Sequence, residues 1–134
     1  AVLALPSSRA SFALVQTDTI PALYSWGSND RGVLGLGDLV TRHTPTLVTS
    51  VAASAIGRVT ASGCNNAVYL TLTDGRLVTF GGDNGGGGDG LALATDRPNP
   101  VLLAHALSTV SVVAVAAGCR AAFALSDTGR VYTW

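Results

Sequence analysis

The sequence of 134 residues contains no lysine, no glutamate and no methionine, so all eight basic residues are Arg and all eight acidic residues are Asp. Lysine, glutamate and methionine are among the better helix formers, and their absence disfavours long helices. Sixteen glycines also interrupt the apolar stretches at short intervals. This composition favours short β-strands joined by tight turns, and we expect an all-β fold.

The sequence also lacks an excess of charge of either sign and any long apolar run. Its formal net charge is zero, and no basic cluster is present, which disfavours nucleic acid and anionic membrane surfaces as partners. No apolar run approaches the roughly 20 residues of a membrane-spanning helix, so we expect no membrane insertion. The hydrophobic content of 48% instead predicts a folded domain with an apolar core.

One short sequence element occurs three times. "LYSW" ends at Trp26, "LVTF" at Phe80 and "VYTW" at Trp134, so these aromatic residues are spaced by 54 residues. The segments "SRASFAL", "GCNNAVYL" and "GCRAAFAL" precede them, and the glycines that begin the last two, Gly63 and Gly118, are 55 residues apart. Periods of this length are typical of propellers and solenoids, whose units bury their apolar faces by stacking on one another.

Each period contains four short apolar segments, which is the content of one propeller blade. We therefore expect one partial β-propeller over residues 1–134, with a first blade over 1–56, a second over 57–110 and an incomplete third over 111–134. The predicted strands are 1–5, 9–15, 22–26 and 45–48 in the first blade, 57–62, 66–72, 76–80 and 99–103 in the second, and 111–117, 120–126 and 130–134 in the third.

The segments "YSWGSNDRGVLGLGD" and "VTASGCNNAVYLTLTDGRLVTFG" resemble the repeat of the regulator of chromosome condensation 1 (RCC1) family. The resemblance covers nearly the whole chain and implies four-stranded antiparallel blades of a seven-bladed propeller, of which this chain resembles two and three-quarter repeats. Because Trp26, Phe80 and Trp134 recur at one place in each repeat, we expect them to pack between blades rather than to stack on bases or sugars. The expected structural positions of the blades are Trp26, Gly27, Gly63, Phe80, Gly81, Gly118 and Trp134.

The glycine-rich run 81–90, "GGDNGGGGDG", could hold a phosphate, or calcium through Asp83, Asn84 and Asp89. It lacks the Lys-Ser/Thr pair of a P-loop and the acidic spacing of an EF-hand, so we interpret it as a loop and expect no cofactor. His43 and His105 share no motif with a nucleophile or with metal ligands, and we expect them at the surface. We therefore predict no catalytic residue, no metal site and no enzymatic activity.

Cys64 and Cys119 occupy matching places in two repeats. A disulfide between them requires that the ends of neighbouring strands approach closely. Without nearby His or acidic residues the two cysteines make a poor metal site. We expect buried free thiols, and hence an intracellular, reducing compartment.

Charged residues gather after the third strand of each repeat, where a propeller displays a face for interaction. They are Asp30, Arg31, Asp38, Arg42, Asp96 and Arg97. Two interpretations remain open, contact with a protein partner and a solvated rim.

These observations favour a non-catalytic scaffold for protein–protein interaction, as a subunit or fragment of a larger assembly. The resemblance to the founding member of the family implies an alternative, guanine-nucleotide exchange on a small GTPase, although no residue here can be matched to that activity. A partial propeller leaves apolar faces on its end blades, so we expect it to need further blades, copies of itself or a large complex.

Overall fold

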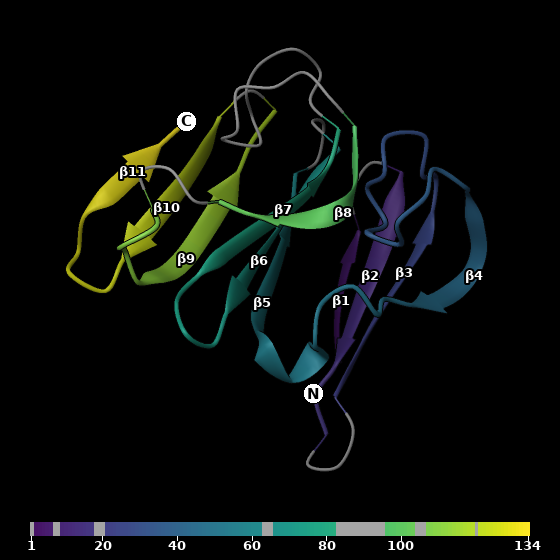
Figure 1. Cartoon of the computed structure of the whole chain (residues 1–134), viewed down its shortest axis with the longest axis horizontal. Helices are drawn as coiled ribbons and strands as arrows, with labels where there is room; N and C mark the ends of the chain where they lie inside the picture. The colour runs from purple at the N-terminus through teal and green to yellow at the C-terminus, as the bar shows by residue number, and fades with distance from the viewer. Residues whose placement is uncertain are drawn as a thin grey trace.

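The computed structural model describes the backbone of residues 2–6 and all of residues 9–17, 21–62, 66–82, 96–103, 107–119 and 121–134. These residues form three antiparallel sheets in chain order (Figure 1). The first sheet contains β1 (Val2–Pro6), β2 (Ala10–Val15), β3 (Ala22–Gly27) and β4 (Arg42–Leu47). The second contains β5 (Ile56–Ala61), β6 (Ala67–Leu72), β7 (Leu77–Gly81) and β8 (Arg97–Leu102). The third contains β9 (Val112–Ala117), β10 (Ala122–Ser126) and β11 (Val131–Thr133).

Each sheet is a meander in which consecutive strands pair, and the only helical piece among the described residues is a 3₁₀ turn at Ala53–Ala55. The all-β fold and the partial propeller are thereby confirmed. Most predicted strands lie within two residues of the observed bounds, but β4 begins at Arg42 and not at residue 45. The reason is that Arg42 already pairs with Gly27. Pro45 is tolerated within β4 because an edge strand needs no hydrogen bond donor on its outer side.

The hairpin pairing shows which residues of the three repeats are equivalent. Trp26 pairs with Ser11 and Phe80 pairs with Val68, while the backbone of Trp134 exchanges hydrogen bonds with Ala122. The next residue along each second strand is therefore Phe12, Tyr69 or Phe123. Aligning the repeats by Gly63 and Gly118 instead matches Phe123 with Val68, which is wrong by one residue. Five residues join β5 to β6 and four join β9 to β10, so the difference in length lies in this connection.

Two apolar cores lie between neighbouring sheets. Between the first and second sheets, the ring of Phe12 packs against that of Phe80, with centroids 6.3 Å apart. Between the second and third sheets, Tyr69 packs edge-on against Trp134 at 5.8 Å. In both contacts the second strand of one sheet supplies a ring to the aromatic residue at the end of the third strand of the following sheet. Stacking of the sheets, as expected of repeat units, is therefore observed in two successive interfaces.

All six residues of β6 are buried, because the first sheet covers one face of this strand and the third sheet covers the other. By contrast, burial in β10 alternates strictly, so this strand has one covered face and one open face. The sheets thus differ in burial although their hairpins are equivalent.

Gly27 ends β3 with a φ of +113°, and a Cβ atom there would lie 2.4 Å from the carbonyl oxygen of Arg9. Gly129 also has a positive φ, of +81°, but a Cβ atom there meets nothing within 4 Å. Gly129→Ala should cost about 1 kcal/mol for the left-handed backbone alone. Gly27→Ala should cost roughly 2 kcal/mol more, because the backbone of Arg9 must move. Urea unfolding of both variants measures the difference, and equal losses would contradict this packing.

Candidate interaction surface

The buried amide side chain of Asn29 helps to hold the loop between β3 and β4. Its Nδ2 atom donates to the backbone oxygen of Asp38 at 2.8 Å, and its Oδ1 atom accepts from the backbone nitrogen of Leu34 at 2.9 Å. The Ser25 hydroxyl donates to the Leu34 carbonyl at 2.8 Å. Leu34 is itself fully buried, so the loop is anchored both by hydrogen bonds and by its apolar side chain. A buried amide with these partners gives the loop a defined shape.

Asp38 organises the last part of the same loop. Its carboxylate accepts a hydrogen bond from the backbone nitrogen of Val40 at 2.9 Å and pairs with Arg42 at 2.6 Å. The hydrogen bonds from the Val40 backbone and from the Arg42 side chain, together with the charge of Arg42, lower the pKa of Asp38 below its ordinary value. Arg42 also donates to the Val40 carbonyl at 2.6 Å. Asp38 and Arg42 therefore hold the tight turn that contains Leu39 and Val40.

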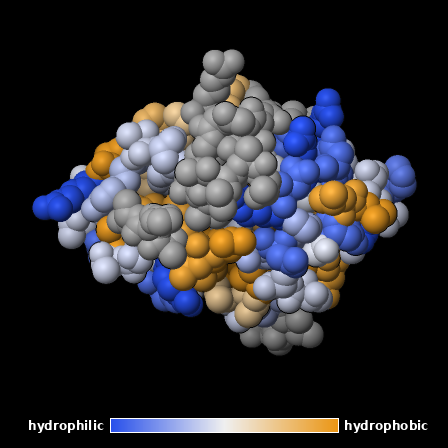
Figure 2. All heavy atoms as spheres, turned by 45° about the horizontal axis from the view of Figure 1, so that its top comes forward, coloured by the Kyte–Doolittle hydropathy of each residue, from blue (hydrophilic) through white to orange (hydrophobic). Residues whose placement is uncertain are grey.

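This turn exposes two large apolar side chains. The exposed fraction is 49% for Leu39 and 60% for Val40. Hydrophobic residues stand out among hydrophilic ones at the side of the molecule where β4 lies (Figure 2). Because the turn is fixed by hydrogen bonds, the apolar pair is displayed in one conformation, which lowers the entropy cost of contact with a partner.

The loop of the first sheet also crosses to the second sheet. Gly37 donates its backbone N–H to the Pro98 carbonyl at 3.0 Å, and the backbone of Gly32 lies against Pro98. Arg31 pairs with Asp96 at 3.3 Å across the same boundary. A Cβ atom on Gly35 would lie 3.0 Å from the ring of Phe80, so this loop also closes one end of the first core. The loop is thus part of the contact between two blades.

The structure brings predicted charged residues of the loops into ion pairs. Asp38 pairs with Arg42, Arg31 with Asp96, and Asp30 with Arg9 at 3.5 Å. Arg97 begins β8 opposite Gly81 and is partly buried. Exposed pairs of this kind contribute only about 0–1 kcal/mol each. Their main effect here is to orient the loops, and whether they touch a partner stays a prediction.

The predicted structural positions occupy different surroundings. Phe80 is fully buried, whereas Trp26 and Trp134 are partly exposed. Gly27 and Gly81 end β3 and β7 with positive φ angles, and the Gly118 carbonyl accepts a hydrogen bond from the Ser62 hydroxyl at 2.8 Å. Gly63, His105 and residues 83–90 of the glycine-rich run, with Asp83, Asn84 and Asp89, lie outside the described residues. His43 lies exposed in β4, as expected.

The expectation of a free thiol is wrong for Cys119, which is disulfide-bonded. Cys119 follows β9, and this strand end lies close to the second sheet, as the contact of Ser62 with Gly118 shows. That approach is the condition that a disulfide requires. Cys64, the other cysteine of the sequence, lies outside the described residues. No motif in the sequence indicated whether Cys119 would be disulfide-bonded or a free thiol.

The described residues contain no group of three or more His, Cys, Asp or Glu side chains that could hold a metal ion. Among the same residues, no helix is long and apolar enough to cross a bilayer.

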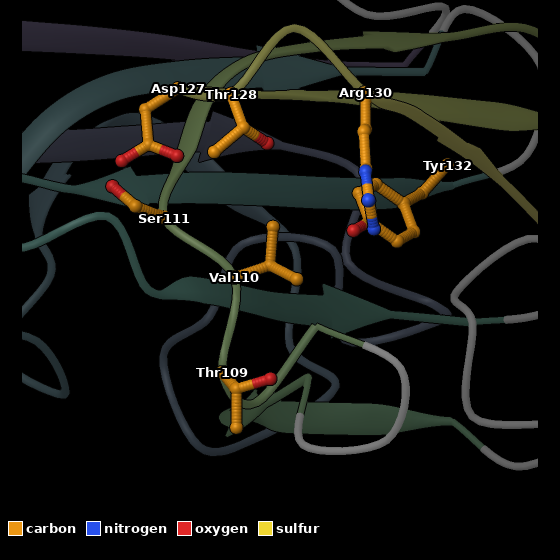
Figure 3. A pocket seen from close by; sticks show the side chains of 7 residues that line it. All are labelled: Thr109, Val110, Ser111, Asp127, Thr128, Arg130 and Tyr132. Atoms are coloured by element: carbon orange, nitrogen blue, oxygen red, sulfur yellow. The ribbon is translucent and has the colours of Figure 1, made fainter.

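A pocket of about 570 Å³ opens beside the turn between β10 and β11. In Figure 3, Ser111 and Asp127 lie on one side of Val110, and Arg130 and Tyr132 lie on the other. The complete lining is Thr109, Val110, Ser111, Asp127, Thr128, Arg130 and Tyr132. These residues offer hydroxyls, a carboxylate and a guanidinium, but no imidazole or thiol to form a pair of nucleophile and base. The pocket can therefore make polar contacts, and it lacks the side chains of an acyl-transfer site.

Comparison with known proteins gives matches in both sequence and structure. The model of the Regulator of chromosome condensation (RCC1) repeat matches residues 22–68. The chain is 32% identical over 116 residues to human E3 ubiquitin-protein ligase HERC2, covering 84% of the chain and 2% of that protein. It is 30% identical over 112 residues to the X-linked retinitis pigmentosa GTPase regulator of Canis lupus familiaris, covering 84% of the chain and 11% of that protein.

Among solved structures, that of Prp20p from Saccharomyces cerevisiae, a protein studied for its binding to Gsp1p and histones, superimposes on this chain with a TM-score of 0.75. The identity is 22%, and the match covers 98% of this chain and 32% of Prp20p. This likeness shows the fold. The chain spans only a small part of the length of each of these proteins.

The lowered pKa of Asp38 predicts a pH-dependent contribution to stability. A carboxylate whose pKa is lower in the folded state stabilises that state above the pKa of the unfolded chain, ordinarily near 3.8 for Asp. This contribution disappears as the pH falls through the folded pKa. Asp38→Asn should therefore lower the melting temperature at pH 7, and the difference from the unchanged chain should shrink steadily below about pH 4. A difference that stays constant from pH 7 to pH 2 would contradict the proposed role of the Asp38 charge.

The disulfide at Cys119 predicts a specific pattern of alkylation. In the unfolded chain, without reductant, Cys119 should not react with iodoacetamide, and after reduction it should react fully. Peptide mass spectrometry measures both states. Alkylation of Cys119 before reduction would show that the bond is absent from the purified protein.

Proposed function

Because this chain belongs to the RCC1 repeat family, we propose that it is a non-catalytic module for protein–protein interaction within a larger assembly. The observation that carries the proposal is the turn of Leu39 and Val40, whose backbone is held by Asp38 and Arg42 and whose two apolar side chains are exposed. An exposed and preorganised apolar pair surrounded by polar residues is typical of a contact for another protein.

The electrostatics of the same surface support a protein partner over a nucleic acid. The charged residues around the turn occur as pairs of opposite sign, such as Arg31 with Asp96 and Arg9 with Asp30. A surface of paired charges creates little net attraction for phosphate groups, whereas it can match polar groups of a protein. We accordingly propose a protein partner, no nucleic acid and no membrane insertion.

A second candidate is guanine-nucleotide exchange on a small GTPase. Prp20p binds Gsp1p, and the chain covers 32% of Prp20p. An exchange site needs groups that displace the nucleotide and its metal ion, and we assign none of the described residues to that task. Exchange therefore stays the alternative.

A reducing compartment was expected because the cysteines were expected to be free thiols. Cys119 is disulfide-bonded, so this argument no longer holds. The intracellular compartment therefore rests on none of the described residues.

Binding through the turn can be tested with three forms of the chain. The unchanged chain, the double variant Leu39→Asp/Val40→Asp and the control Leu47→Asp are immobilised and exposed to extract of the source organism, with and without GTP. Leu47 is also exposed, but it lies at the end of β4 outside the turn. We expect proteins that are retained by the unchanged chain and by the control and that are lost by the double variant, independently of GTP. The same set of proteins on all three forms would contradict the proposed contact.

The alternative can be tested directly with Gsp1p loaded with a fluorescent GDP analogue. We expect the chain to leave the rate of GDP release unchanged. An increase in that rate with chain concentration would overturn the non-catalytic proposal in favour of exchange.

A further inference from the structure

The hairpin turns of the second and third sheets differ in the order of two residues. The turn between β6 and β7 is "TDGR" at residues 73–76, and the turn between β10 and β11 is "DTGR" at residues 127–130. Gly75 and Gly129 have positive φ angles at the same place in both turns. The carboxylate therefore occupies the second position of one turn and the first position of the other.

This exchange decides whether the arginine of the turn has a partner. In the second sheet, Oδ2 of Asp74 pairs with Nε of Arg76 at 2.7 Å. In the third sheet, Thr128 stands at the position of Asp74 and carries no charge. No ion pair or side-chain hydrogen bond joins Asp127 or Arg130 to another residue that the structure describes. The third sheet thus carries two unpaired charges of opposite sign beside one turn.

Both charged side chains line the pocket beside this turn. Its volume of about 570 Å³ lies within the range of roughly 300–1,000 Å³ that is typical of ligand pockets. In Figure 3, Asp127 lies with Ser111 on one side of Val110, and Arg130 lies with Tyr132 on the other. The pocket therefore has a negative end, a positive end and an apolar side chain between them.

The accessibility of these charges does not result from the place where the sequence ends. Val110 and Tyr132 pack against the core between the second and third sheets, so they belong to an interface within this chain. The equivalent turn of the second sheet has a fourth strand, β8, and a following sheet that contacts it at Gly75. Even so, the side chains of Asp74 and Arg76 are 50% and 58% exposed. A fourth strand and a further sheet leave the charges of such a turn accessible.

We propose that this pocket binds a peptide segment of a protein partner that carries one basic and one acidic side chain. The basic side chain pairs with Asp127, and the acidic side chain pairs with Arg130. Val110 contacts the peptide between these two side chains. The hydroxyls of Thr109 and Ser111, which also line the pocket, can donate to the carbonyl groups of the peptide backbone.

The two charges of the pocket select against other ligands. An anion such as phosphate is attracted by Arg130 and repelled by Asp127, and a simple cation experiences the reverse. A free α-amino acid carries both charges on one carbon atom, whereas the charged groups of the pocket lie on opposite sides of Val110. A peptide with the two charges on different residues matches this separation.

This site is separate from the turn of Leu39 and Val40. The pocket lies beside a turn that precedes a third strand, whereas Leu39 and Val40 follow a third strand. The two sites are therefore at opposite ends of the strands, as Figure 1 shows for the β10–β11 turn and the β3–β4 loop. The peptide site goes beyond the proposed function and can fail without affecting it.

The test is a titration of the ¹⁵N-labelled chain with short peptides, followed by the NMR shifts of backbone amides. Each peptide is blocked at both ends and contains lysine and glutamate, in either order, separated by one, two or three glycines. We expect at least one peptide to shift the amides of Ser111 and Asp127 saturably. Analogues with glutamine in place of lysine or glutamate should bind about tenfold more weakly, because each leaves one charge of the pocket unpaired.

The variant Asp127→Thr/Thr128→Asp gives the third sheet the turn of the second. Its carboxylate should pair with Arg130 as Asp74 pairs with Arg76, so peptide binding should be lost. We expect the fold to be kept, because the chain already contains this turn. The matched control Asp74→Asn breaks the ion pair of the other turn and should bind the peptide like the unchanged chain. The variant Leu39→Asp/Val40→Asp should also bind it unchanged.

The amide spectrum of each variant shows whether the fold is kept. If the rearranged turn disturbs amides outside the third sheet, Arg130→Gln replaces it, because this variant alters one exposed side chain and should also lose binding. The proposal would be overturned if no peptide gave saturable shifts or if the neutral analogues bound equally well. Normal binding by the rearranged variant or by Arg130→Gln, or loss of binding by Asp74→Asn, would also overturn it.

Discussion

The structure depends on one constraint, that the first and second sheets each bury an aromatic ring against the sheet that follows. The contact of Phe12 with Phe80 and that of Tyr69 with Trp134 are the same interaction in two successive places. None of the three sheets has an apolar core of its own among the described residues, since each core is formed by side chains from two neighbouring sheets. Burial of these rings, together with the aliphatic side chains around them, couples the sheets to one another.

The surface that we propose for partner contact follows from the same coupling. The loop after β3 covers the ring of Phe80 with Gly35 and reaches Pro98 with Gly37, so its position depends on the second sheet. Within the loop, Asn29 and Asp38 accept hydrogen bonds from the backbone and so fix the conformation of the loop. The exposed pair of Leu39 and Val40 is thus displayed by the contact between blades and not by a free loop.

Much of the fold can be predicted from the sequence because each repeat has an aromatic residue at the same position, the end of its third strand. The spacing of Trp26, Phe80 and Trp134 predicts three equivalent hairpins, and the pairing of their strands agrees with that spacing. The alignment of the glycines misses a difference of one residue before β10, because connections between strands tolerate changes in length. The predicted start of β4 at residue 45 was wrong because Arg42 is a charged residue and gives no apolar signal of a strand. It belongs to β4 through its pairing with Gly27.

The candidate site was harder to predict, because its contacts join residues that are distant in the sequence. The charged residues could be assigned to the loops, but the pairing of Arg31 with Asp96 needs the approach of two sheets. Asn29 carries no motif, and only its burial reveals its role. The most direct test of the central constraint is hydrogen exchange of backbone amides in β6 and β10. The account predicts that β6, which neighbouring sheets cover on both faces, exchanges more slowly than β10, which is covered on one face. Equal protection of the two strands would contradict it.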